Sequence, residues 1–347
     1  MTKRPDLVDL VSDTATRPTA GMLRAMSEAP LGDEQKGEDP TTSRLEQRAA
    51  ELLGTEAALL LPSATLANQI ALALLCDGGD EVVCHRTAHV YNYETGGTAI
   101  TARAQIQPID GHRGFFSGED VRRVFRADDP HFPRTRVAVV ENTSNGGGGS
   151  VWPDALFDSV ADACDELSVH LHIDGARLMN AAVAANVPPT RWTKRATTVQ
   201  MCFSKGLGCP FGAVLALPQA LFWRARRLKQ AMGGALRQSG VLAGAMLYAL
   251  DHHIERLAED HARARRLAEG LASIEGIKVE PVDTNLVFFH VEKEGTDAKD
   301  FCEGLLARKV RMGAVTATRV RACLHLDVDD EGVERALEAA RAVMAGA

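Results

Sequence analysis

The sequence predicts an α/β fold in which a large domain with a mostly parallel β-sheet is followed by a small C-terminal α/β domain. Two observations lead to this prediction. Short apolar runs alternate with helical patterns between residues 57 and 217, which is typical of strands buried between two helical layers. A chain of 347 residues is also too long for one ordinary hydrophobic core, and this length favours two domains.

The first segments precede the sheet. Residues 7–17 are expected to form an extended arm with a turn at Ser12-Asp13-Thr14. Apolar residues at helical spacing then predict helices over residues 18–28 and 42–53, and the second helix is expected to end at Gly54.

Seven apolar runs bounded by turn residues are predicted to form the large sheet. They are residues 57–61, 81–84, 105–109, 136–140, 169–173, 199–203 and 212–217. The helical segments between these runs, beginning with residues 66–75, are expected to cover both faces of the sheet.

The helical pattern over residues 236–272 is longer than a usual globular helix, and we interpret it as one helix that connects the domains. Gly240 and Gly244 are the points at which it could bend. The remaining chain predicts strands over 278–280, 286–291 and 319–324 and helices over 298–308 and 331–345. The predicted units are therefore an arm (1–17), a large domain (18–245) and a small domain (246–347).

Composition excludes several classes of protein. The chain has 45% hydrophobic and 24% charged residues, as folded proteins do, and its net charge of -7 argues against a nucleic-acid partner. No apolar run reaches the roughly 18 residues of a membrane span, and residues 1–6 do not start a signal peptide. The seven cysteines are scattered without a C-x-x-C pair, which favours reduced thiols and a cytoplasmic location.

Lys205 is the first candidate for chemistry. It lies in the stretch Phe203-Ser204-Lys205-Gly206-Leu207-Gly208, directly after a predicted strand. A lysine in an apolar site is poorly solvated, so its pKa falls and the neutral amine can attack a carbonyl group. Taken alone, Lys205 is better explained as a solvated loop lysine.

Asp174 ends another predicted strand in the stretch Ile173-Asp174-Gly175-Ala176-Arg177. Ligands of open α/β sheets bind beyond the carboxyl ends of the strands. A carboxylate at that edge can keep the pyridine nitrogen of pyridoxal phosphate protonated, although it could also simply cap the next helix. Lys205 and Asp174 at the ends of two successive strands together favour a pyridoxal-phosphate site.

A phosphate site is predicted at the start of the helix that follows Pro62-Ser63-Ala64-Thr65. Free amides and the positive end of a helix attract phosphate, and Ser63 and Thr65 add hydroxyl groups. The alternative is ordinary capping of the helix by Ser63 or Thr65.

Two histidines are candidate bases. His89 follows a predicted strand and could stack on a cofactor ring or move protons, whereas His131 lies in a predicted loop, where a residue without a catalytic role is the simpler explanation. His85 and His89 are four residues apart but lack the glutamate of a zinc helix, so no metal is expected. The glycine run 146–149 lacks the lysine of a P-loop and is interpreted as a tight, mobile turn.

Taken together, these segments resemble the low-specificity L-threonine aldolases, which are fold-type I pyridoxal-phosphate enzymes. The matching stretches are residues 10–18, 37–41, 89 with 93–94, 141–143, 172–177, 204–208, 237–240, and 321 with 325–327. They occur in order along nearly the whole chain, which is more specific than any one motif.

The resemblance implies roles toward the cofactor. Lys205 would bind pyridoxal phosphate as a Schiff base, and Asp174 would pair with its pyridine nitrogen. His89 would stack on the ring, and Ala64 and Thr65 would hold the phosphate.

The resemblance also implies how substrate and subunits are arranged. Ser12, Arg177 and Arg321 would hold the substrate carboxylate, for which the planar fork of arginine is suited, and Arg177 would also lie near the ring hydroxyl. Arg237, with Lys229 as a second candidate, would reach the phosphate of a neighbouring subunit. The implied assembly is a homotetramer, a dimer of dimers with shared active sites.

Three positions depart from the family pattern. Ala64 replaces a common glycine of the phosphate loop, Lys36 replaces a tyrosine, and Ser144 replaces a histidine. The cofactor residues are kept, so these departures are expected to affect the substrate pocket.

The activity implied is reversible cleavage of L-threonine, L-allo-threonine and related L-β-hydroxy-α-amino acids to glycine and an aldehyde. His89 or His131 would remove the hydroxyl proton. The alternatives are another pyridoxal-phosphate lyase, acting by β-elimination or on bulkier or α-substituted β-hydroxy amino acids, and a non-catalytic binding protein on the same scaffold.

Overall fold

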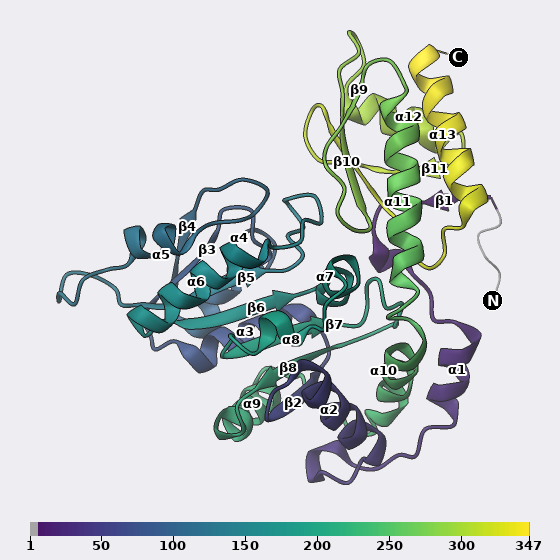
Figure 1. The fold of residues 1–347 in the computed structure, drawn as a ribbon. Helices are drawn as coiled ribbons and strands as arrows, with labels where there is room; N and C mark the ends of the chain where they lie inside the picture. The colour runs from purple at the N-terminus through teal and green to yellow at the C-terminus, as the bar shows by residue number, and fades with distance from the viewer. Residues whose placement is uncertain (1–5, 347) are drawn as a thin grey trace.

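The fold is known from a computed structural model that describes residues 6–346 (Figure 1). Residues 1–5, on which most of the signal-peptide expectation rests, and residue 347 lie outside this range. Two parts are visible: a wide sheet with its helices, and a smaller sheet beside which the C-terminal helix ends.

The larger sheet is mostly parallel, as predicted. Its strand order is β2 (Ala57–Leu61), β8 (Ala213–Leu217), β7 (Thr198–Cys202), β6 (His170–Gly175), β5 (Thr135–Glu141), β3 (Glu81–His85) and β4 (Gln105–Ile109). Only β8 runs against its neighbours among these seven strands. All seven predicted strands are confirmed, with ends that differ by two residues at most.

Helices cover both faces of this sheet because successive strand residues point to opposite sides. On one face, Leu59, Val82 and Val139 share a core with α3 (Ala64–Leu75) and α9 (Gln219–Ala231). The other face is covered by α2 (Pro40–Leu53), α5 (Gly118–Val124), α6 (Asp154–Leu167), α7 (Leu178–Ala185), α8 (Thr190–Thr193) and α10 (Gly240–His252). Helix α1 (Ala20–Ser27) packs on α10. The left-handed Gly54 ends α2, as its place in the sequence predicts.

The smaller part has its own core. Its antiparallel sheet has the order β12 (Gly313–Ala314), β13 (Arg319–Cys323), β10 (Leu286–Val291) and β9 (Ile277–Val279). The helices are α11 (Leu257–Ala272), α12 (Ala298–Ala307) and α13 (Asp330–Ala345). The arm joins this part, because β1 (Val8–Asp9) pairs with β11 (Val310–Arg311). The arm otherwise forms a short 3-10 turn at Asp13–Ala15, and α4 (His89–Asn92) follows β3.

The single long helix expected over residues 236–272 is wrong. The chain forms α10 and α11 with a break at residues 253–256, and Gly240 starts α10 instead of bending it. Both helices bury an apolar face, so the apolar periodicity continues across the break and hides it. The predicted domain boundary at residue 245 falls inside α10 and stays a prediction.

The glycine run is a packed junction and not the mobile turn that was expected. Residues 147–149 are buried, and a Cβ on Gly147 would lie 2.0 Å from the carbonyl oxygen of Arg113. Thr284, from the smaller part, donates a hydrogen bond to the carbonyl of Gly149 (2.7 Å). The glycines therefore let the two parts approach closely.

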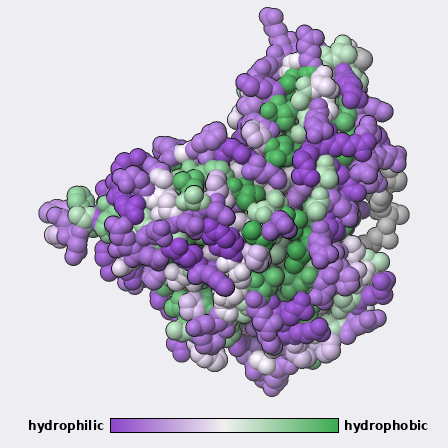
Figure 2. Space-filling view, in the orientation of Figure 1, coloured by the Kyte–Doolittle hydropathy of each residue, from purple (hydrophilic) through white to green (hydrophobic). Residues whose placement is uncertain are grey.

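The surface in Figure 2 is mostly hydrophilic, with apolar residues gathered near the meeting point of the two parts. Within residues 6–346, the structure contains no helix with the length and apolar character to cross a membrane.

Candidate active site

The candidate site lies at the carboxyl edge of the large sheet. Glu141 is the last residue of β5, Asp174 is near the end of β6, and Lys205 follows the end of β7 by three residues. These three strands are parallel neighbours, so their carboxyl ends meet at one edge, where ligands of such sheets bind.

The Lys205 side chain has no hydrogen bond or ion pair with any described residue, but its backbone is held firmly. The Lys205 carbonyl accepts from Gly208 N (2.8 Å) and from Thr16 Oγ1 (3.3 Å). His253 Nδ1 lies 2.7 Å from the Leu207 carbonyl and donates to it. A half-buried amine on a fixed loop, without a protein partner, is available to a ligand.

Asp174 is 1% exposed, and both of its carboxylate oxygens accept hydrogen bonds. Asn68 Nδ2 donates to Oδ2 (2.8 Å) and the Ala176 amide to Oδ1 (3.2 Å). A buried charge is tolerated when it is hydrogen-bonded in this way. The carboxylate is therefore fixed in direction.

His89 pairs with Glu94, whose side chain is completely buried. His89 Nδ1 lies 2.9 Å from Glu94 Oε1, so Nδ1 donates and Nε2 is the nitrogen left to accept a proton. Burial opposes charge on His89, but the hydrogen bond to Glu94 and the charge of Asp174 raise the pKa of His89 above its ordinary value. Burial and the charge of Asp174 also raise the pKa of Glu94.

Ligand atoms of His89, Glu94 and Asp174 lie within 4.8 Å of one another, a spacing at which a cation could bind. Asn68 Nδ2, however, donates to Glu94 Oε1 and to Asp174 Oδ2, both at 2.8 Å. The Asn68 amide group therefore lies close to both carboxylates and directs one hydrogen at each of them, where a cation would otherwise sit. The arrangement therefore suits protons better than a metal.

Glu141 was not among the sequence-predicted site residues, although its place at a strand end is the signal that singled out Asp174. Its Oε2 accepts from the His89 amide (2.7 Å) and its Oε1 from the Asn145 amide (2.6 Å). Burial, with the charge of Asp174, raises the pKa of Glu141 to about 7. Glu141 thus fixes the backbone of two residues that line the site.

Arg177, placed at the start of α7, is held by a buried carboxylate that the sequence reasoning missed. Asp13 accepts from Arg177 Nε (2.7 Å) and Nη2 (2.8 Å). Burial opposes ionisation of Asp13, but the neighbouring Arg177 lowers the pKa of Asp13 to about 2. Most of the Arg177 fork is therefore used inside the protein. Asp13 had no sequence signal beyond its place next to Ser12.

Arg321, on β13, has fewer of its donors in strong hydrogen bonds than Arg177 has. Its Nη2 donates to the Val11 carbonyl (2.9 Å) and its Nη1 to Asn145 Oδ1 (3.4 Å), and no described carboxylate pairs with it. Arg177 Nη1 reaches the same Asn145 oxygen (3.3 Å). The structure thus brings both predicted arginines together. Ser12 precedes the Asp13 of this group, and its Oγ caps the 3-10 turn by accepting from Thr14 N.

The predicted phosphate site is the first turn of α3. Ser63 caps the helix by accepting from Leu66 N (3.1 Å). The Ala64 and Thr65 amides have no partner among the described residues, as expected for the first amides of a helix. Ser63 therefore caps the helix while the amides of Ala64 and Thr65 stay free. This first turn is partly exposed, so an anion can bind to the free amides.

Lys229 and Arg237 pair with acidic residues of the segment 33–34 and not with residues of the candidate site. The Lys229 ammonium is buried in an ion pair with Glu34 of its own chain. Arg237 is 61% exposed and pairs with Asp33 (3.1 Å). A role toward a neighbouring subunit stays a prediction for both residues. Arg237 is the more accessible of the two, because Lys229 is buried.

His131 does not join the group within one chain. Its side chain is 85% exposed and bonded to Asp129 (2.8 Å). It lies shortly before β5, whereas Glu141 ends this strand, and seven strand residues span roughly 20 Å. His131 as a base stays a prediction that would need a second copy of the chain.

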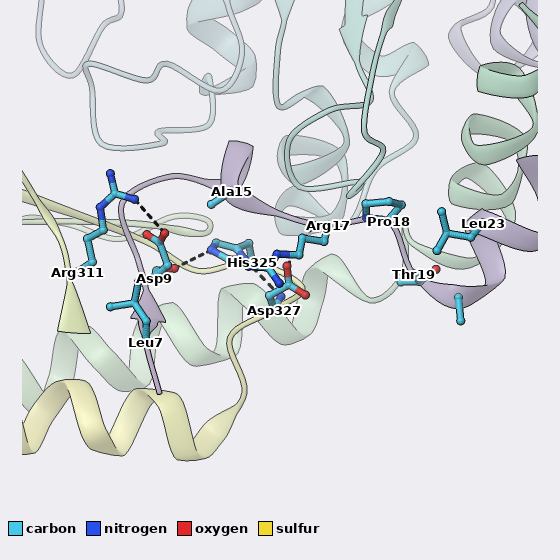
Figure 3. A pocket seen from close by; sticks show the side chains of 11 residues that line it. Leu7, Asp9, Ala15, Arg17, Pro18, Thr19, Leu23, Arg311, His325 and Asp327 are labelled. Atoms are coloured by element: carbon cyan, nitrogen blue, oxygen red, sulfur yellow. Dashed lines mark hydrogen bonds and ion pairs between the residues drawn. The ribbon is translucent and has the colours of Figure 1, made fainter. Parts of the chain in front are cut away.

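A separate cavity of about 520 Å³ lies beside the arm (Figure 3). Its lining includes Ala15, Arg17, Arg311 and Asp327, and Arg311 pairs with Asp9 of the neighbouring strand at one side of it (3.1 Å). None of the predicted site residues lines it. The chemical groups at the carboxyl edge, and not the size of a cavity, identify the candidate site.

Comparisons with known proteins agree with this arrangement. Residues 9–294 match the beta-eliminating lyase family. The chain is 40% identical to a low-specificity L-threonine aldolase of Escherichia coli (94% of this chain, 96% of the relative). It is 37% identical to a probable low-specificity L-threonine aldolase of Arabidopsis thaliana (95% of each). A solved threonine aldolase from Leishmania major has the same fold, with a TM-score of 0.83 at 20% identity over 97% of this chain and 99% of that one.

Proposed function

The chain belongs to the beta-eliminating lyase family and, within it, to the low-specificity L-threonine aldolases, and on that premise we propose that it cleaves L-threonine, L-allo-threonine and related L-β-hydroxy-α-amino acids to glycine and an aldehyde. The predicted family, the carbon–carbon lyase class and the dependence on pyridoxal phosphate are confirmed. The observation that carries the proposal is the unpartnered Lys205 amine beside the fixed Asp174 carboxylate at one sheet edge.

The residues present fit pyridoxal phosphate. Lys205 offers a free amine for the aldehyde carbon, and Asp174 offers a buried carboxylate for the pyridine nitrogen. The free amides of Ala64 and Thr65 suit a phosphate. When bound, the cofactor supplies an electron sink for the bond that is broken.

Arg321 is the best candidate to hold the substrate carboxylate. It lacks a carboxylate partner of its own, and its free donors match the two oxygens of a carboxylate. Ser12, which keeps a hydroxyl hydrogen to donate, can add a hydrogen bond. Holding the carboxylate restricts the rotation of the substrate, and such orientation contributes strongly to rate.

His89 is the favoured base. Its Nδ1 is committed to Glu94, so Nε2 can take the proton of the β-hydroxyl group as the aldehyde leaves. A general base typically contributes about 100- to 10,000-fold. His131 ranks behind His89 because one chain holds it at the other end of β5.

The oligomeric state and the cellular location are inferred from the resemblance to the same family. We propose a homotetramer with shared active sites, which is the assembly that the family resemblance implies. We also propose a cytoplasmic location, supported by seven cysteines that are all free thiols.

The test is product analysis on the purified protein with added pyridoxal phosphate. L-Threonine, L-allo-threonine, L-phenylserine and their D forms are compared, and we expect glycine and aldehyde from the L forms. Lys205→Ala should lower turnover by on the order of 10,000-fold or more, because the covalent anchor is lost. Ammonia and a keto acid as products would instead indicate β-elimination, and the absence of a visible cofactor band would contradict an enzyme of this class.

A further inference from the structure

Asn68 connects two carboxylates of the site. It lies in α3, one turn after Thr65, and is 1% exposed. Its Nδ2 is 2.8 Å from Asp174 Oδ2 and 2.8 Å from Glu94 Oε1. One amide group has two hydrogens, so Asn68 can donate one to each carboxylate.

The orientation of Asn68 is set from its other side. His172 Nε2 lies 3.1 Å from Asn68 Oδ1, and His172 Nδ1 lies 2.8 Å from Thr198 Oγ1. Because ionised carboxylates only accept, the Asn68 nitrogen must face them, and its oxygen must accept from His172 Nε2. Burial lowers the pKa of His172 to about 4, so the ring is neutral at pH 7 and its Nδ1 accepts from the Thr198 hydroxyl.

We propose that Asn68 is a positioning residue that holds Asp174 toward the pyridine nitrogen of the cofactor and Glu94 toward His89, and that His172, fixed by Thr198, sets the orientation of Asn68. This assignment rests on the proposed function, since it concerns the same site. Asn68 acts through Asp174 and Glu94 and is not itself a catalytic residue.

The need for such a residue follows from charge. Asp174 and Glu94 are both buried, and their oxygens are close enough for one nitrogen to reach both. Two carboxylates at that separation repel, which favours protonation of one of them. A shared amide donor offsets this repulsion and keeps each carboxylate an acceptor for its own partner, the ring nitrogen or His89 Nδ1.

The first experiment measures the dissociation constant of pyridoxal phosphate and the visible circular dichroism of the bound cofactor for Asn68→Leu. Leucine has a similar volume but donates no hydrogen bond. We therefore expect the dissociation constant of pyridoxal phosphate to rise at least about tenfold and the dichroic band of the bound cofactor to change. Gln105→Leu is the control for the loss of an amide donor away from the site, because the exposed Gln105 donates to the buried Glu81 (2.7 Å) at the amino end of the sheet. This control should bind the cofactor as the wild type does.

A second pair tests the direction of the hydrogen bonds. His172→Gln can keep a donor near the position of Nε2, whereas His172→Asn keeps a polar group only on the Thr198 side. We expect cofactor affinity and the dichroic band to be largely restored in His172→Gln and lost in His172→Asn. Thermal unfolding of the cofactor-free variants identifies those that are folded and can be compared.

The outcomes separate this assignment from the proposed function. A wild type that gains no visible band with pyridoxal phosphate overturns both. A wild type that binds, with a folded Asn68→Leu that binds within twofold of it, overturns the role of Asn68 alone. Equal losses in His172→Gln and His172→Asn overturn the role given to His172.

Discussion

The two ends of the large sheet both carry buried carboxylates, but these carboxylates lie among different neighbours. At the amino end, Glu81 accepts from Gln105 (2.7 Å), Thr135 (3.3 Å) and Arg126 (3.4 Å), so its charge is satisfied inside the protein. At the carboxyl end, Lys205 has no side-chain partner among the described residues, and the buried Glu94 Oε2 also has none.

Residue type alone therefore does not distinguish a structural cluster from a candidate active site. Both ends contain buried acids beside arginines. Because buried polar groups are normally satisfied, the unpartnered Lys205 amine and Glu94 Oε2 leave capacity for a ligand at the carboxyl end. The following predictions test this distinction with one variant at the carboxyl end and two at the amino end.

The largest effect is expected for Asp13→Asn at the carboxyl end. It leaves the Arg177 charge buried without its partner, which should lower the free energy of unfolding by on the order of 3–5 kcal/mol. The affinity for L-threonine should also fall, because Arg177 and Arg321 share Asn145. Urea unfolding and the KM of L-threonine measure the two effects; an unchanged KM would separate Asp13 from the substrate site.

This loss should depend on pH. The pKa of Asp13 is about 2 in the folded protein, against an ordinary value of 3.8. A lowered carboxyl pKa stabilises the fold above the ordinary value, and this contribution, about 2 kcal/mol, is lost as the pH falls from about 4 to about 2. The difference between wild type and Asp13→Asn should therefore shrink below pH 4, and a constant difference would contradict the ion pair.

A middle effect is expected for Glu81→Gln at the amino end. The substitution removes a buried charge whose partners then lose hydrogen bonds, so stability should fall by about 1–3 kcal/mol. Turnover and KM should stay as in the wild type, because no site residue contacts Glu81. A catalytic defect in folded Glu81→Gln would break the comparison between the two ends.

The smallest effect is expected for His131→Asn. An exposed residue typically changes free energies by about 0.5 kcal/mol or less, which corresponds to about twofold in turnover. Steady-state cleavage of L-threonine measures it. A fall of 100-fold, with cofactor binding retained, would place the amino end at the active site of a second copy and restore His131 as a base.

Much of the fold could be predicted from the sequence because strands and helices have local patterns of apolar and turn residues. The seven strands of the large sheet were located through apolar runs and turn residues, and α2 through its spacing and Gly54. The break between α10 and α11 was not predicted, because apolar residues recur at helical spacing on both sides of it. The glycine run was misread because its tight packing depends on Thr284 and Arg113, which are distant in the sequence.

For the candidate site, the sequence alone was enough to place Asp174 near the end of one strand, Lys205 shortly after another, and Ala64 and Thr65 at the start of a helix. Strand order and direction bring such positions together, so their places along the chain were informative. Which of these groups have hydrogen-bond partners depends on the folded chain: Asp13 accepts from Arg177, and Asn68 donates to both Asp174 and Glu94. These contacts join residues from 26 to 164 positions apart, and no local pattern encodes a hydrogen bond over such separations.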